Sequence, residues 1–175
     1  MPLKALAIPL PITPEVVQSH PALQFYAIYG RKFPTTDSQW QTQDFEEFYS
    51  SDCKTLLPNN KILSTGEAGW EHFRRLYSTF PKVERELRSG IVVYSDDEDK
   101  GKWKGKYEIH VEFITKLYTT ADDEKDGGGV VELPQSFVYV LGKADEGKGT
   151  LGLQIRELRN YYDLRTLEEA LGEKI

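Results

Sequence analysis

The stretch that decides the fold is Leu151–Leu171, which reads LGLQIRELRNYYDLRTLEEAL. From Leu151 to Ile155 it alternates apolar and polar residues, and this period of two predicts a β-strand. After Ile155 the apolar phase slips by one residue and resumes at Leu158. Such a slip is typical of a β-bulge, and bulges bend sheets. The stretch therefore predicts a long, bent strand that ends near Asp163, in a curved sheet that holds a cavity.

The composition describes a folded domain that is rich in aromatic residues. The chain has 175 residues, which suits one domain with a core of ordinary size. Hydrophobic residues make up 39% and charged residues 29%, which favours a folded chain over a disordered one. The ten Tyr, eight Phe and three Trp are typical of a domain that lines an apolar pocket, and equally of a Tyr-rich core.

Charge, cysteine content and hydropathy exclude several classes of function. The net charge of −6 argues against a nucleic-acid partner, because phosphate backbones are bound by clustered Lys and Arg. The single cysteine, Cys53, excludes an intramolecular disulfide and a Cys-based zinc cluster. No apolar run approaches the roughly 18 residues that a membrane span needs. We therefore expect no membrane association and no metal site.

The N-terminal residues resemble a signal sequence only weakly. Pro9 and Pro11 break the short apolar stretch, and no small-residue cleavage site follows. We predict an extended, Pro-rich arm over residues 1–13 and a single domain over residues 14–175. A cytoplasmic location is expected.

The first half of the chain predicts about three helices. Thr13-Pro14 opens the first, His20-Pro21 interrupts or restarts it, and Gly30 is placed to end it. A short second helix is predicted over residues 44–49, followed by a hairpin whose turn is Pro58-Asn59-Asn60. The third begins with the pair Ser64 and Glu67 as a capping box and ends before Pro81.

The second half predicts a meander of strands. Leu87, Ser89, Ile91 and Val93 are expected on one face of the first strand. Strands over residues 107–113 and 131–141 follow, and the bent strand of the opening stretch is the last. Loops rich in Asp, Glu, Lys and Gly are expected over residues 95–102, 120–129 and 142–150.

This order of elements resembles the nuclear transport factor 2-like superfamily, and within it the SnoaL-like branch. The resemblance covers roughly residues 14–167. It is carried by four segments: FEEFYSSD (45–52), LPN (57–59), TGE (65–67) and QIRELRNYYD (154–163). It implies an α+β cone in which a strongly curved antiparallel sheet wraps around the helices and encloses a pocket. It also implies sheet-mediated homodimers, so we expect a homodimer.

The resemblance also suggests site residues. In SnoaL-like cyclases a carboxylate acid or base lies near the position of Asp163; the favoured alternative is that Asp163 caps a short terminal helix over residues 164–171. Tyr26 matches, by position, the region of an oxyanion-hole tyrosine in ketosteroid isomerases, and the alternative is a core tyrosine. Tyr161 would be a second hydrogen-bond donor. His110 is a candidate proton shuttle, but it shares the polar strand face with two glutamates and is expected outside the cone.

Three functions remain open from the sequence. The first is an isomerase, cyclase or dehydratase that acts on an apolar, carbonyl-containing metabolite by acid/base catalysis without a cofactor. The second is a non-catalytic module that binds a ligand or a protein, which predicts a pocket without a buried carboxylate or histidine. The third is a dimerisation domain, which predicts a cone filled with side chains. His72 is expected on a solvated helix flank and His20 in a turn.

Overall fold

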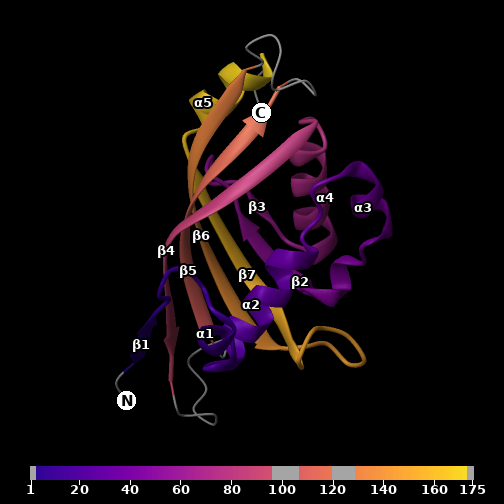
Figure 1. The fold of residues 1–175 in the computed structure, drawn as a ribbon. Helices are drawn as coiled ribbons and strands as arrows, with labels where there is room; N and C mark the ends of the chain where they lie inside the picture. The colour runs from indigo at the N-terminus through magenta and orange to yellow at the C-terminus, as the bar shows by residue number, and fades with distance from the viewer. Residues whose placement is uncertain (1–2, 96–106, 120–128, 173–175) are drawn as a thin grey trace.

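The chain folds into one curved sheet with helices against it, as expected for an α+β cone (Figure 1). The computed structural model describes residues 3–95, 107–119 and 129–172, so the predicted loops over 95–102 and 120–129 lie almost wholly outside the described residues. The strands are β1 (Lys4–Ala7), β2 (Tyr49–Leu56), β3 (Ile62–Leu63), β4 (Lys82–Tyr94), β5 (Tyr107–Tyr118), β6 (Val130–Lys143) and β7 (Leu153–Tyr162). Across the described residues their order is β1-β4-β5-β6-β7-β2-β3. All neighbours are antiparallel except β2 and β7, which are parallel.

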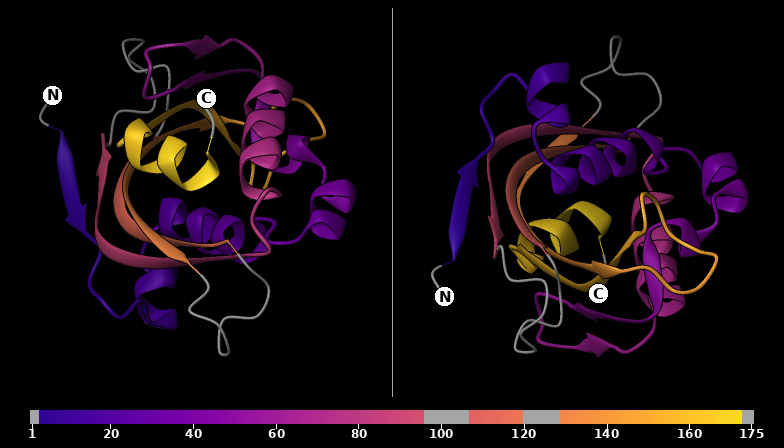
Figure 2. Two further views of the ribbon diagram at one scale, coloured as in Figure 1. Left: turned by 90° about the horizontal axis from the view of Figure 1, so that it is seen from above. Right: turned by 90° about the horizontal axis from the view of Figure 1, so that it is seen from below.

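The helices lie at the hollow side and at one end of the sheet. They are α1 (Pro14–Gln18), α2 (Pro21–Lys32), α3 (Asp37–Thr42), α4 (Gly66–Tyr77) and α5 (Leu164–Leu171), with a short 3₁₀ turn at Phe45–Glu47. Figure 2 shows the sheet curling around α2 and α5, with α4 beside the opening of the curve. The terminal helix predicted over residues 164–171 is confirmed as α5, and its Leu167 is fully buried.

The N-terminal arm is part of the sheet. β1 pairs with the far half of β4, so the extended arm expected over residues 1–13 adds an edge strand. The amide of Ile8 continues this pairing by donating to the Gly90 carbonyl at 2.8 Å, and the Ile8 side chain is buried. The arm therefore contributes side chains to the same core as the rest of the chain.

The helices differ from the sequence expectation at four places. Gly30 lies inside α2 rather than at its end, and the helix stops at Phe33, whose extended backbone (ψ 122°) is the conformation favoured before Pro34. The segment 44–49 forms only a 3₁₀ turn, because Tyr49 already begins β2. Helix α3 was not predicted, and Thr65 rather than Ser64 caps α4 through its side chain.

The bulge predicted in the last strand is confirmed. Opposite β6, Leu141 pairs with Ile155 and Val140 with Glu157, which leaves Arg156 as the extra residue. At the same place the register of β2 jumps from Tyr49 to Lys54, so residues 50–53 stand opposite Arg156 alone. Leu151, expected on the strand, instead lies exposed in the preceding turn with a left-handed backbone (φ 55°).

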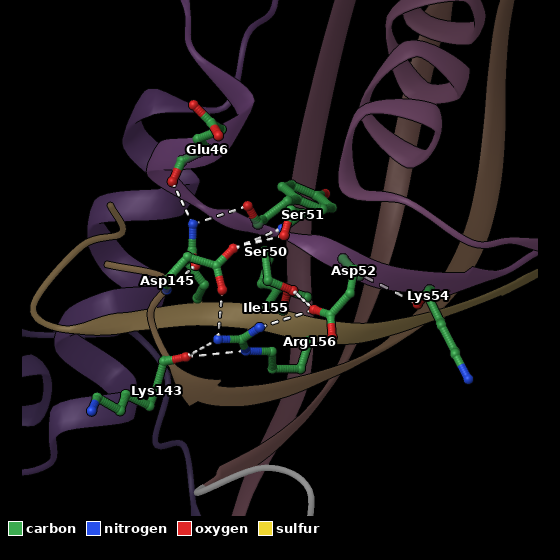
Figure 3. A network of polar contacts seen from close by, with 12 residues as sticks. Glu46, Ser50, Ser51, Asp52, Lys54, Lys143, Asp145, Ile155 and Arg156 are labelled. Carbon is green, nitrogen blue, oxygen red and sulfur yellow. Dashed lines mark hydrogen bonds and ion pairs between the residues drawn. The ribbon is translucent and has the colours of Figure 1, made fainter. Parts of the chain in front are cut away.

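Side-chain hydrogen bonds and ion pairs stabilise the bulge of β7 and the facing irregularity of β2 (Figure 3). The Arg156 guanidinium reaches Asp52 and Asp145, each at 2.9 Å, and also donates to the carbonyl oxygen of Lys143. Asp145 in turn accepts from the backbone and the side chain of Ser51 at 2.9 and 3.0 Å. The bend of the sheet is therefore tied to the loop that joins β6 to β7.

A second bulge changes the phase of β4. Leu87 pairs with Phe113 and Ser89 with Glu112, so Arg88 is the extra residue. Because of this bulge, Ser89 and Ile91 do not share the inner face with Leu87, and the expected common face is wrong. Inner positions before the bulge are instead Val83, Arg85 and Leu87, all of which line the cavity described below.

Candidate binding pocket

A cavity of about 390 Å³ lies between the helices and the inner face of the sheet. This volume is within the range of small-molecule sites in proteins. It is bounded by α2, α4, the segment that follows α2, and the central strands β4, β5 and β6. Its lining comprises Ile12, Leu23, Tyr26, Ala27, Tyr29, Gly30, Arg31, Phe33, Thr35, Phe73, Tyr77, Val83, Arg85, Leu87, Phe113, Phe137 and Tyr139.

Aromatic rings are the largest group of lining side chains, and they contact one another. The rings of Phe137 and Tyr139, two positions apart on β6, are stacked with centroids 5.8 Å apart. Tyr139 also contacts Tyr26 and Tyr29 of α2, at 5.7 and 5.5 Å between centroids. Tilted and edge-on contacts of this kind are favourable beyond the area they bury. These contacts fix the positions of the rings relative to one another.

Buried tyrosine hydroxyls supply polar groups to this apolar wall. The hydroxyls of Tyr29 and Tyr49 share a hydrogen bond of 2.9 Å. Burial raises the pKa of Tyr26 and of Tyr29 well above the ordinary value, and the Arg85 charge opposes this only in part. Burial raises the pKa of Tyr139 as well. These phenols remain protonated at neutral pH, so they can donate hydrogen bonds but cannot serve as bases.

Arg85 is the charged group of the pocket wall. Its guanidinium carbon lies 4.7 Å from the ring centroid of Phe33 and 4.4 Å from that of Tyr77. Such cation–π contacts favour a guanidinium over an aromatic face. Among the described residues its Nη2 is buried without a hydrogen-bond partner. Arg31, which is exposed, also contributes to the lining.

The described lining residues include no Asp, Glu or His. The pocket therefore offers hydrogen-bond donors and positive charge, but no side chain of this lining could accept a proton from a bound molecule near neutral pH. This is the composition that the non-catalytic alternative predicts.

Of the four site residues suggested by the sequence, Tyr26 alone is among the lining residues. Asp163 is exposed and caps α5, where it accepts from the amide of Arg165 and the hydroxyl of Thr166, each at 3.0 Å. Tyr161 is 46% exposed on the outer face of β7. The structure therefore does not bring Asp163 and Tyr161 together with Tyr26 around the cavity.

His110 lies on the outer face of β5, as the strand alternation predicts. Its Nε2 is 3.3 Å from Glu108, and its neighbours Tyr107, Ile109 and Val111 point inward and are buried. His20 caps α2 by accepting from the amide of Ala22 at 3.2 Å. Neither residue lines the cavity.

His72 is not on a solvated flank, which corrects the sequence expectation. Its Nε2 is buried without a hydrogen-bond partner among the described residues, and burial lowers the pKa of His72 to about 4, with Arg75 and Lys61 adding to the shift. Helix α4 packs against β2, with Gly69 directly beside Thr55, and His72 lies three residues further along the same side of the helix. His72 is therefore neutral in the folded protein at pH 7.

The site residues expected from the sequence do not include Arg85 or most of the aromatic residues that line the cavity. The signal for Arg85 was present: Val83, Arg85 and Leu87 alternate with charged residues, and this places a single arginine on an otherwise apolar strand face. Extending the predicted strand toward residue 82 would have revealed it. The contributions of Phe33 and Tyr77 depend on packing between elements and leave no comparable pattern.

A second hollow, of about 420 Å³, has different walls. It is lined by Asp52, Lys54, Val140, Lys143, Arg156 and Glu157. Its charged groups include the Asp52–Arg156 ion pair that holds the strand bend. The aromatic pocket is therefore the stronger candidate for a site that takes a largely apolar molecule.

Two further features concern the described residues. They bring together no group of three or more His, Cys, Asp or Glu side chains that could hold a metal ion. None of the helices described is both long enough and apolar enough to cross a lipid bilayer.

Comparison with known proteins identifies the fold. No family model matches the sequence, and no curated protein matches it. Among solved structures, a protein from Shewanella putrefaciens CN-32 named after SnoaL-like polyketide cyclases is 13% identical, with a TM-score of 0.56 over 92% of this chain and 95% of that chain. The protein Aln2 from a Streptomyces species is 16% identical, with a TM-score of 0.55 over 90% of this chain and 97% of that chain.

A nuclear transport factor 2-like protein of unknown function from Rhodospirillum rubrum ATCC 11170 is 13% identical, with a TM-score of 0.50 over 81% of this chain and 98% of that chain. The chain therefore shares the nuclear transport factor 2-like fold with these structures. The expected α+β cone is confirmed. Because a shared fold does not determine chemistry, function has to be argued from the pocket.

Proposed function

We propose that this protein binds a small, largely apolar molecule in the aromatic pocket. The observation that carries the proposal is a cavity of about 390 Å³ whose wall is formed mainly by aromatic and aliphatic side chains. Binding sites for small molecules combine such walls with a few placed polar groups. Here Arg85 and the hydroxyl of Tyr26 are polar groups of that kind.

A fluorescent probe tests binding directly. N-phenyl-1-naphthylamine is neutral, apolar and emits when shielded from water. We expect saturable binding of one molecule per chain. Ala27→Trp, which places an indole in the lining, should abolish it, whereas Gln24→Trp on the same helix, outside the lining, should leave it unchanged. Absence of saturable binding, or equal binding by Ala27→Trp, would refute the proposal.

An enzyme of the isomerase, cyclase or dehydratase type is the second candidate. It is supported by Tyr26, whose protonated hydroxyl lies in the wall and could donate to a carbonyl or enolate oxygen. Against it, Asp163 and His110 lie outside the lining. Hydrogen–deuterium exchange at the carbon next to the carbonyl of bound aryl ketones is the test. Exchange that Tyr26→Phe slows would support catalysis, and no exchange above the rate in buffer would dismiss it.

A homodimer is part of the same proposal. Ile91 and Tyr161 lie exposed on the outer face of the sheet, where a second copy could cover them. Light scattering at micromolar concentration should give twice the mass of 20.1 kDa. A mass of one chain would overturn the dimer without affecting the pocket.

A further inference from the structure

Arg85 occupies an unusual position for a charged residue. It projects from the inner face of β4 into a wall whose neighbouring members are the rings of Phe33 and Tyr77. Arginine is normally exposed or paired with a carboxylate, because a guanidinium removed from water needs hydrogen-bond acceptors. Two aromatic faces stabilise the charge but accept no conventional hydrogen bond from its edge.

The described part of the chain leaves this guanidinium without an acceptor. Arg85 is half-buried: its Nη2 is buried without a hydrogen-bond partner, and no carboxylate of the described residues forms an ion pair with its guanidinium. The described lining offers no Asp or Glu that could approach it. The other arginine of the lining, Arg31, adds a second positive charge at an exposed position. A chain with a net charge of −6 thus has a cavity whose charged lining residues are all cationic.

The unmet need of Arg85 defines what a ligand must supply. A guanidinium presents parallel N–H groups in one plane, and this geometry matches the two oxygens of a carboxylate. The guanidinium carbon lies against the rings of both Phe33 and Tyr77. These two contacts limit the orientations that the plane of the guanidinium can adopt. The remaining wall accepts an apolar, ring-bearing body.

We propose that the ligand of this pocket is a monocarboxylic acid with an apolar, ring-bearing body, and that its carboxylate binds Arg85. This inference rests on the proposed binding function and specifies its ligand class. The acid supplies the counter-charge that the described lining lacks around Arg85, while its body packs against Phe137 and Tyr139. Arg31 attracts the anion toward the cavity.

Matched probes test the assignment by titration calorimetry at pH 7. 2-Naphthoic acid carries the carboxylate, and 2-naphthamide has nearly the same shape without the charge. On the native protein we expect the acid to bind at least tenfold more tightly than the amide. Equal affinity, or tighter binding of the amide, would overturn the proposal. Tighter binding of 2-naphthyl phosphate than of the acid would also overturn it.

Variants of two arginines on one strand locate the effect. Arg85→Gln should reduce the acid-to-amide preference to about one, because it removes the charge and keeps hydrogen-bonding groups. Arg88→Gln should keep the full preference, since Arg88 is exposed and pairs with Glu86 at 3.0 Å. A preference that survives Arg85→Gln would refute the role of Arg85. If that variant fails to fold, Arg85→Lys, which keeps the charge without the fork, should lower the preference several-fold, and an undiminished preference would refute the bidentate contact.

The two proposals fail in different ways. If neither acid nor amide binds the native protein, and N-phenyl-1-naphthylamine does not bind either, the binding function itself is wrong. If the neutral probes bind but the acid has no advantage, the pocket binds ligands and only the carboxylate assignment is wrong.

Discussion

Replacing Arg156 by Met should destabilise the fold by about 2–3 kcal/mol. Arg156 occupies the bulge of β7 and donates to the Lys143 carbonyl from both Nε and Nη2. Hydrogen bonds from a charged group contribute about 1.5–3 kcal/mol, and water can replace part of this at the exposed carbonyl. The ion pairs with Asp52, which is 77% exposed, and with Asp145, which is 31% exposed, add about 0–1 kcal/mol each.

The measurement is urea unfolding followed by tryptophan fluorescence. It gives the loss in the free energy of unfolding directly. In a thermal melt, a loss of this size should lower the melting temperature by about 5–10 °C for a chain of this length. Arg88→Met is the matched control, because Arg88 also occupies a bulge but, within the described residues, has only an exposed ion pair with Glu86. We expect that control to lose less than about 0.5 kcal/mol.

Salt separates the two contributions of Arg156. In 0.5 M NaCl the ion pairs are screened, whereas the bonds to the Lys143 carbonyl persist, so most of the difference between Arg156→Met and Arg88→Met should remain. Equal losses in the two variants would show that the bend of β7 does not depend on this network. The contacts of Arg156 would then contribute nothing to stability beyond those of an exposed ion pair.

Three other outcomes are expected. The pKa of His72 is about 4 in the folded protein, against 6.5 ordinarily, so the unfolded chain takes up a proton first as the pH falls. The free energy of unfolding should therefore be highest above pH 6.5 and fall by about 2–3 kcal/mol toward pH 4. In urea titrations, His72→Gln should remove that part of the pH dependence. Gly66→Ala should lower the free energy of unfolding by about 1–3 kcal/mol in calorimetry, since the new Cβ would lie 2.3 Å from the Ser50 carbonyl oxygen. Gly30→Ala should instead raise it by about 0.5–1 kcal/mol, because a Cβ at that position meets no atom within 4 Å. Asp163→Ala should lower stability by about 1 kcal/mol by removing the α5 cap, with ligand binding in the pocket unchanged; lost binding at unchanged stability would contradict the capping role.

Much of the fold could be predicted because its signals are local. The slip after Ile155 revealed the bulge of β7, and the spacing of apolar residues revealed α4 and α5. By contrast, β2 reads YSSDCKTL, which has no sustained alternation. Its strand conformation depends on pairing with β7, and its bulge over residues 50–53 interrupts any period. Tertiary contacts override local preference there.

The candidate site was less accessible from the sequence than the fold. Tyr26 was found through family resemblance. Arg85 was missed because the predicted strand began at Leu87, whereas β4 begins at Lys82 and the same alternation places Arg85 beside Leu87 on the inner face. Asp163 was predicted as a catalytic carboxylate because it is a polar residue at the end of a strand, although the same position suits the N-cap of a helix. The roles of Asp163, Tyr161 and His110 in catalysis remain predictions, as do the cytoplasmic location and the absence of a nucleic-acid partner.

The parallel pairing of β2 with β7 has a consequence for synthesis on the ribosome. The side chain of Gln154 bonds the Tyr49 carbonyl at 3.0 Å, across 105 residues of chain. At roughly 5–20 residues per second, β2 emerges about 5–20 s before the strand that will cover its edge. In the described sheet β2 pairs with β3 and β7, and during that interval only the two-residue strand β3 is available. The nascent chain therefore presents an unpaired strand edge for many seconds, which is the kind of surface that chaperones bind.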